Sequence, residues 1–124
     1  MIINLTQHNA SPEQTTAGVV DVPAELRAEL TALLTFTTLP TKEEIDEAAM
    51  KVAAMAVICC QGSDAPAAMI GGAPFFMAAL EAALRHYGIK PLYAFSERVS
   101  EEKMDADGTV RKVNIFKHKG FVEV

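Results

Sequence analysis

In residues 70–98 the chain reads IGGAPFFMAALEAALRHYGIKPLYAFSER, and this stretch decides the fold. The glycine pair Gly71-Gly72 ends a short apolar run at 67–70 and opens a helix, for which Gly88 is the expected C-cap. The uncharged run Pro91–Phe95 that follows is typical of a central parallel strand. Strand, helix and strand in this order predict a parallel β-α-β unit.

Apolar strands also alternate with helices upstream of this unit. Ser11 and Thr41 each begin a capping box, because Gln or Glu stands three residues later and can cap the helix start in return. The expected elements are a strand at Ile2–Leu5, a short helix from Ser11 to about Gly18, a short strand at Val19-Val20, and helices over Pro23–Leu34 and from Thr41 to about Gly62.

The C-terminal part of the sequence has a different pattern. Two polar-alternating runs, Arg98–Met104 and Thr109–His118, are joined across Asp105–Gly108, whose Asp-Gly pair is typical of a hairpin turn. Residues 121–124 are expected to form a last strand segment. We therefore predict a single α/β domain over residues 1–124. It is a three-layer Rossmann-like fold with a mostly parallel sheet and a C-terminal antiparallel β-hairpin arm at about residues 98–118.

Composition and charge exclude several classes of protein. The net charge of −5 argues against a general DNA-binding surface, which needs clustered cations to displace counterions. The apolar stretch from Val52 to Leu80 is interrupted by Gly and Pro, so we expect no membrane span. Cys59 and Cys60 lie within an apolar helical pattern and read as small core residues of a reduced, cytoplasmic protein. The N-terminus lacks the basic region of a signal peptide.

Candidate site residues follow the ends of the predicted parallel strands. In open α/β sheets, ligands bind at the carboxyl ends of the strands, where the strand order reverses. Three groups of residues are expected to meet there: Gln7, His8 and Asn9 after the first strand, Gly71 and Gly72 after the second, and Ser96 and Arg98 after the third.

These residue types suit an anionic ligand, and a phosphate in particular. Bare backbone at Gly71 and Gly72 lets a phosphate approach the amides at a helix start, although such a pair is also typical of a plain strand-to-helix turn. His8 can transfer a proton or donate to a phosphate oxygen, or it is a loop histidine with no such role. The Arg98 guanidinium matches a phosphate, but acidic neighbours such as Glu97 are equally suitable partners.

Other chemistries find little support in the sequence. Lys117 and His118 form a small basic cluster at the end of the hairpin, which is either part of the site or a solvated strand face. The three histidines, His8, His86 and His118, lack metal-ligand spacing, so neither a metal nor a cofactor is expected. No Gly-x-Ser-x-Gly elbow is present.

The chain resembles the ring nucleases, small CRISPR-associated proteins of the Rossmann-like (CARF) type that bind and cleave cyclic oligoadenylate. Three segments carry the resemblance: the first strand with its polar turn at His8 and the SPEQ helix start, the segment IGGAPFFMAALEAALRHYGIKPLYAFSER, and the segment DGTVRKVNIFKHKGFVEV. Together they cover about half of the chain in the expected order. Residues 20–60 match no such pattern.

The resemblance implies a homodimer with a two-fold cleft and a metal-independent reaction in which a ribose 2′-hydroxyl attacks the adjacent phosphorus. It also implies a role for each candidate residue: Gly71 and Gly72 would cradle phosphate, Ser96 and Arg98 would contact phosphate or ribose, His8 would be the acid or base, and Lys117 and His118 would reach in from the hairpin. A non-catalytic nucleotide sensor or sponge of the same fold, or a structural protein that binds a partner, are the alternative functions.

Overall fold

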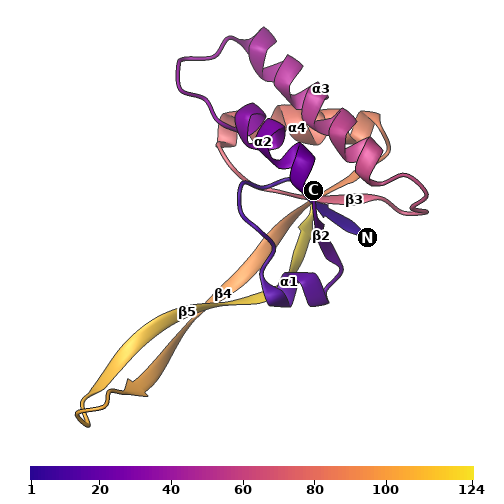
Figure 1. Ribbon diagram of the computed structural model, residues 1–124. Coiled ribbons are helices and arrows are strands. Elements are labelled where there is room, and N and C mark those ends of the chain that lie inside the picture. The colour runs from indigo at the N-terminus through magenta and orange to yellow at the C-terminus, as the bar shows by residue number, and fades with distance from the viewer.

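A computed structural model describes all residues from Met1 to Val124. Its centre is one five-stranded sheet with the strand order β2-β1-β3-β4-β5 (Figure 1). Strands β1 to β4 run parallel, and β5 pairs antiparallel with β4. The predicted α/β class, mostly parallel sheet and C-terminal hairpin are therefore confirmed. The strands are β1 (Ile2–Asn4), β2 (Val19–Asp21), β3 (Ala67–Ile70), β4 (Lys90–Met104) and β5 (Val110–Glu123).

Four helices connect the parallel strands. They are α1 (Pro12–Thr16), α2 (Ala24–Leu34), α3 (Lys42–Cys59) and α4 (Pro74–His86). Both predicted capping boxes are formed, at Ser11 before α1 and at Thr41 before α3. Each box satisfies two backbone amides that a helix start would otherwise leave without a partner. None of these helices combines the length and the hydrophobicity that a membrane-spanning helix requires.

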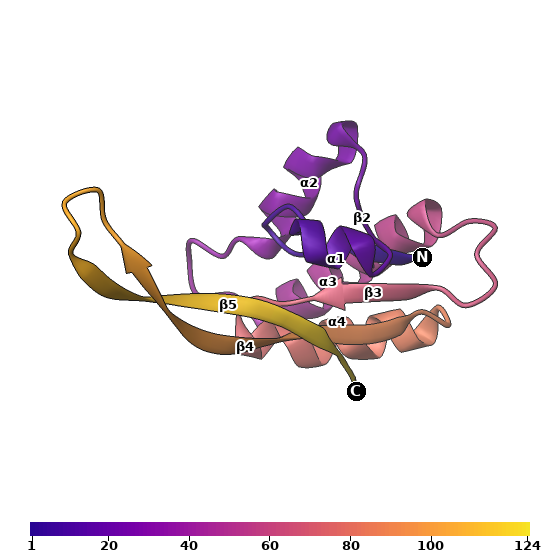
Figure 2. The same cartoon turned by 90° about the horizontal axis from the view of Figure 1, so that it is seen from below.

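The helices are divided unequally between the two faces of the sheet. Helices α2, α3 and α4 lie on one face, and α1 lies on the other (Figures 1 and 2). The division follows from the strand order, because the chain moves outward from β1 to β2 and then returns past β1 to β3 and β4. The layer on the second face thus contains a single helix of 5 residues.

The hydrophobic core lies between the sheet and helices α2 to α4. Alternate residues of β1 and β3 point into it, as the two-residue period of a strand requires. Its fully buried members include Ile3, Ala68, Leu80 and Leu84. On the opposite face Asn4 is also buried, with 1% of its surface exposed. A buried polar side chain of this kind needs hydrogen-bond partners, and Asn4 has them at the candidate site.

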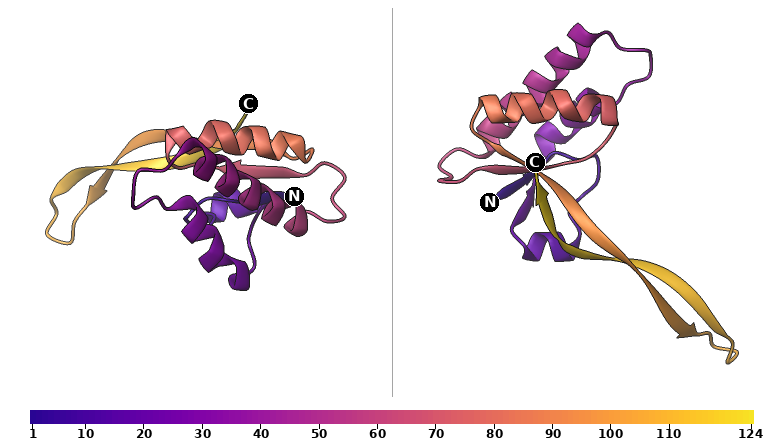
Figure 3. Two further views of the ribbon diagram at one scale, coloured as in Figure 1. Left: turned by 90° about the horizontal axis from the view of Figure 1, so that it is seen from above. Right: turned by 180° about the vertical axis from the view of Figure 1, so that it is seen from behind.

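Strand β4 is longer than the sequence indicated. The predicted strand Pro91–Phe95 and the first hairpin run form one continuous strand, because β4 stays paired with β5 from Leu92 to Met104. Pairing with β3 stops at Tyr93, and the register with β5 shifts between Phe95 and Ser96. Beyond that bulge β4 and β5 project from the body as a two-stranded arm (Figure 3). We call residues 96–118 the arm.

Candidate functional site

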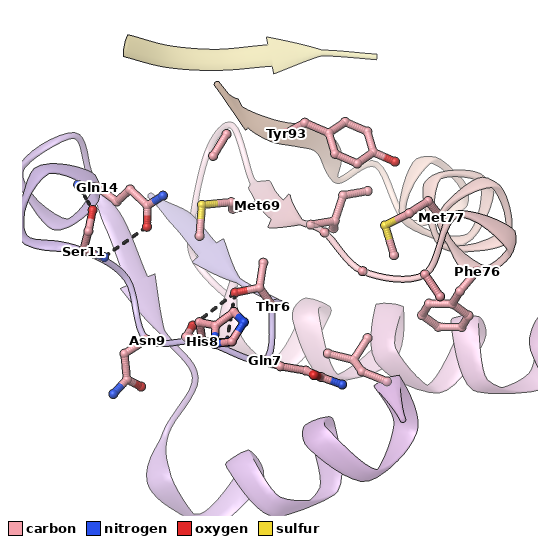
Figure 4. Close-up of a pocket in the computed structure, with 16 residues that line it drawn as sticks. Thr6, Gln7, His8, Asn9, Ser11, Gln14, Met69, Phe76, Met77 and Tyr93 are labelled. Atoms are coloured by element: carbon pink, nitrogen blue, oxygen red, sulfur yellow. Dashed lines mark hydrogen bonds between the residues drawn. The ribbon is translucent and has the colours of Figure 1, made fainter. Parts of the chain in front are cut away.

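A cavity of about 610 Å³ opens at the carboxyl ends of β1 and β3, with β4 forming one wall (Figure 4). This is the point where the strand order reverses, which is where ligands bind in open α/β sheets. The volume lies within the range of pockets that hold small molecules. Its lining residues are Thr6, Gln7, His8, Asn9, Ser11, Gln14, Leu34, Met69, Ile70, Gly71, Gly72, Ala73, Phe76, Met77, Tyr93 and Ala94.

Buried Asn4 shapes the turn that follows β1. Its amide nitrogen donates to the carbonyl oxygen of His8 at 2.7 Å and to Oδ1 of Asp21 at 2.8 Å. Its amide oxygen accepts from the backbone amide of Thr6 at 2.9 Å and from the Thr6 hydroxyl at 2.7 Å. All the main hydrogen-bonding groups of this side chain are satisfied, so Asn4 fixes the turn that presents residues 6–9 to the cavity.

Asp21, at the end of β2, extends this network to the loop before α1. Its Oδ1 atom also accepts from the backbone amide of Ala10 at 2.9 Å. The hydrogen bonds from Asn4 and Ala10, with the positive charge of Arg27, lower the pKa of the Asp21 carboxyl, against a smaller opposing effect of burial. Arg27 on α2 in turn donates to the carbonyl oxygen of Gln7 at 3.2 Å. The turn is therefore held from β1, β2 and α2 together.

The side chains on the turn differ in how firmly they are held. Gln7 donates through Nε2 to the hydroxyl of Thr35 at 3.1 Å. His8 and Asn9 are exposed, and their side chains form no hydrogen bond within the chain. The imidazole of His8 and the amide of Asn9 are thus free to meet a ligand, whereas Gln7 is already partly engaged.

The glycine pair forms the floor of the cavity at the start of α4. Gly72 has φ = +150°, a backbone conformation that favours glycine. Space is not the constraint at this position, because an added Cβ would meet only Met77 Cε, at 3.6 Å. The N-cap residue Ala73 has no side chain that can cap the helix. The backbone amides of Gly72 and Ala73 donate no hydrogen bond within the chain. Free amides at the positive end of a 13-residue helix are suited to an anion.

Tyr93 of β4 forms the wall next to α4. Its hydroxyl donates to Oε2 of Glu81 at 2.6 Å. Burial, followed by the hydrogen bond to the Glu81 carboxylate and its negative charge, raises the pKa of Tyr93 to about 12. The phenol is consequently a fixed, neutral donor, and the residue both packs against the core and lines the cavity.

The other predicted site residues lie on the arm and do not line this cavity. Ser96 and His118 are opposite each other on β4 and β5, and Arg98 is opposite Phe116. Arg98 forms no ion pair within the chain. Lys117 forms one across the arm, with 3.8 Å between its Nζ and Oε1 of Glu101. The separation has a simple cause: β4 continues through Ser96 and Arg98 into the arm, so these residues are not at the carboxyl end of a strand.

His118 occupies an unusual position at the base of the arm. Its backbone amide donates to Oε2 of Glu13 on α1 at 2.9 Å, and its ring packs edge-on against Phe121 with 4.9 Å between ring centroids. Both ring nitrogens are enclosed without a hydrogen-bond partner in the chain. This contact joins the arm to α1, and so has a structural role on the second face of the sheet.

Several residues of the site were missed by sequence reasoning. Asn4 stands as a lone polar residue inside an apolar strand, which was a usable signal, whereas Asp21 and Tyr93 carried none. Ser11 and Gln14 were noted only as a capping box, but they also line the cavity. No group of three or more His, Cys, Asp or Glu side chains in the chain could hold a metal ion.

The cavity therefore offers amide side chains, one free imidazole, a phenol and free backbone amides, but no lysine or arginine side chain among its lining residues. A family model described as the Uncharacterized protein MJ1673 family matches residues 1–122. No curated protein and no solved structure gives a significant match to the chain.

Proposed function

The chain belongs to the Uncharacterized protein MJ1673 family, and we propose that it binds a small phosphate-bearing ligand in the cavity at the carboxyl ends of β1 and β3. The phosphate binds at the free amides of Gly72 and Ala73, at the start of α4. The resemblance to ring nucleases makes cyclic oligoadenylate the expected class of ligand, and we propose a cytoplasmic location.

The observation that carries this proposal is the coincidence of the uncapped helix start with the reversal of strand order. Order β2-β1-β3-β4 is found in doubly wound nucleotide-binding folds, which supports a Rossmann-like relationship with α1 as a thin third layer. Around the amides, Gln14 and Asn9 can hydrogen-bond a base or ribose, and Tyr93 also lines the cavity.

Binding is better supported than cleavage. Of the two candidate catalytic residues only His8 lines the cavity, whereas Arg98 lies on the arm. A cavity without a lysine or arginine side chain can hold one phosphate on backbone amides, but it does little to neutralise the charge that builds up as a phosphodiester is cleaved. Our first proposal is therefore a nucleotide-binding sensor or sponge. Our second is a ring nuclease, in which His8 would transfer the proton.

Calorimetric titration of the protein with cyclic tetra-adenylate, cyclic hexa-adenylate, AMP and inorganic phosphate tests the proposal. We expect Gly72→Ala to weaken binding, because a methyl group and the altered backbone disturb the amides that hold phosphate. Gly62→Ala is the matched control: it also replaces a glycine with positive φ (+84°), but in a loop outside the cavity.

Three outcomes separate the functions. Binding of a cyclic oligoadenylate without any cleavage product supports the sensor. The ring nuclease is supported if the native chain cleaves the ring and His8→Ala abolishes cleavage but not binding. If none of the four compounds binds at concentrations up to about 1 mM, the ligand proposal fails and a structural or partner-binding role replaces it.

A further inference from the structure

The outer edge of β4 in the arm has no pairing partner. β4 pairs with β3 only as far as Tyr93, and from Ser96 to Met104 it pairs with β5 alone. An isolated two-stranded hairpin is marginally stable in water, and a free strand edge is a template for pairing with another chain. The arm projects away from the helices, so nothing in the chain covers this edge (Figures 1 and 3).

We propose that the occupant of this edge is a second copy of the chain, whose β4 pairs antiparallel with β4 across a two-fold axis at Ser100. The segment Glu97–Lys103 reads ERVSEEK. With Ser100 opposite Ser100 of the second copy, Arg98 faces Glu102 and Glu97 faces Lys103. Every charged pair directly opposite at these positions then has opposite signs, and the two-fold axis forms each pair twice.

The ion pairs that the chain already forms leave three of the four charges, those of Arg98, Glu102 and Lys103, available to a second copy. Glu97 and Glu101 have partners on β5, Lys119 at 3.1 Å and Lys117 at 3.8 Å. Arg98, Glu102 and Lys103 form no ion pair within the chain, and Arg98 and Glu102 are exposed on the same face. The ordered signs therefore admit a copy of the same segment, and they disfavour strands of unrelated sequence.

The other free edge of the arm does not fit a second copy in this way. Between residues 110 and 122, β5 carries four cations and no acidic residue: Arg111, Lys112, Lys117 and Lys119. Pairing β5 with β5 of a second copy would crowd like charges along the new edge. Charge complementarity thus selects β4 as the self-pairing edge, and a four-stranded sheet replaces two marginal hairpins.

Sedimentation equilibrium and charge exchange test this interface. We expect a dimer for the native chain, and Arg98→Glu to weaken it by about tenfold or more, because the two-fold axis turns two attractive pairs into repulsive ones. The double variant Arg98→Glu with Glu102→Arg restores opposite signs and should recover the dimer. Asn114→Asp adds a charge on β5 opposite the neutral Ser100, can still accept the Ser100 hydroxyl, and should leave the β4 interface intact.

A cross-link tests the register directly. In the Ser100→Cys variant, the two new thiols lie opposite each other across the axis, within the span of a disulfide between paired strands. Oxidation should then give a covalent dimer on a non-reducing gel, whereas Asn114→Cys, opposite Ser100 on β5, should not.

The inference does not rest on the proposed ligand. It is overturned if the native chain is a monomer at concentrations up to about 1 mM, or if the charge-exchanged double variant stays a monomer although its circular dichroism matches the native chain. A dimer that Arg98→Glu leaves unchanged would place the interface elsewhere, and would equally overturn it.

Discussion

Replacement of Asn4 by alanine removes the side chain that ties the β1 turn to β2, and we expect it to lower the free energy of unfolding by about 3 kcal/mol. The hydrogen bond to the charged Asp21 contributes about 2 kcal/mol. The three bonds to Thr6 and His8 contribute the rest, less than about 1 kcal/mol each, because water reaches their partners when the turn opens. With a urea m-value near 1.5 kcal/mol/M, the unfolding midpoint falls by about 2 M.

The same variant has a pH signature. The pKa of Asp21 in the folded chain lies below its ordinary value of 3.8, and the largest cause is the hydrogen bond from Asn4. A lowered carboxyl pKa adds stability that is present above pH 3.8 and is lost as the pH falls through the folded pKa. Asn4→Ala removes the largest cause of the lowered pKa. The difference in stability between native chain and variant should therefore be larger at neutral pH than near pH 2.

Urea unfolding followed by circular dichroism at both pH values measures these differences. Asn9→Ala is the matched control, because Asn9 is exposed on the same turn without a side-chain hydrogen bond, and its effect should stay within about 0.5 kcal/mol. A loss below about 1 kcal/mol for Asn4→Ala, or a loss that does not depend on pH, would refute the role given to Asn4.

Three further outcomes are expected. Ultraviolet titration should show one phenol that ionises only at about pH 12, and this transition should be absent in Tyr93→Phe. The stability that the raised pKa of Tyr93 provides is present below pH 10 and is lost as the pH rises through 12. Gly72→Ala should lower the unfolding free energy by about 1–3 kcal/mol in urea unfolding, because its φ of +150° strains any other residue. Burial raises the pKa of the Cys59 and Cys60 thiols, so iodoacetamide should label the native chain slowly at pH 8 and the urea-unfolded chain fast, as mass spectrometry can follow.

Local patterns were enough to predict most of the elements. The apolar run at 67–70 is β3 with the bounds expected, and both capping boxes mark true helix starts. Such signals are short-range, since a cap or a strand-ending glycine pair acts within a few residues. For the same reason Gly71, Gly72 and His8 were correctly expected at the ends of β1 and β3, and they share one cavity.

The residues that sequence reasoning misplaced depend on distant partners. Whether β4 ends at Phe95 or continues is decided by pairing with β5, as in Ser96 opposite His118, which is 22 residues further along the chain. Asn4 likewise gains its importance from Asp21 on a neighbouring strand. Hydrophobic periodicity contains neither fact, because it reports burial of a face and not the partner across it.

The continuity of β4 constrains how the two proposals fit together. Tyr93 lines the cavity and Ser100 is the proposed two-fold centre, seven residues further along the strand. At about 3.4 Å per residue, the Tyr93 residues of two arm-paired copies lie roughly 48 Å apart, so no single small ring could fill both cavities. An arm-paired dimer must bind one ligand per chain. A two-fold cleft that shares one cyclic oligoadenylate requires a different interface and one ligand per dimer. The number of ligands bound per chain in the calorimetric titration therefore distinguishes the arm-paired dimer from a dimer with a shared cleft.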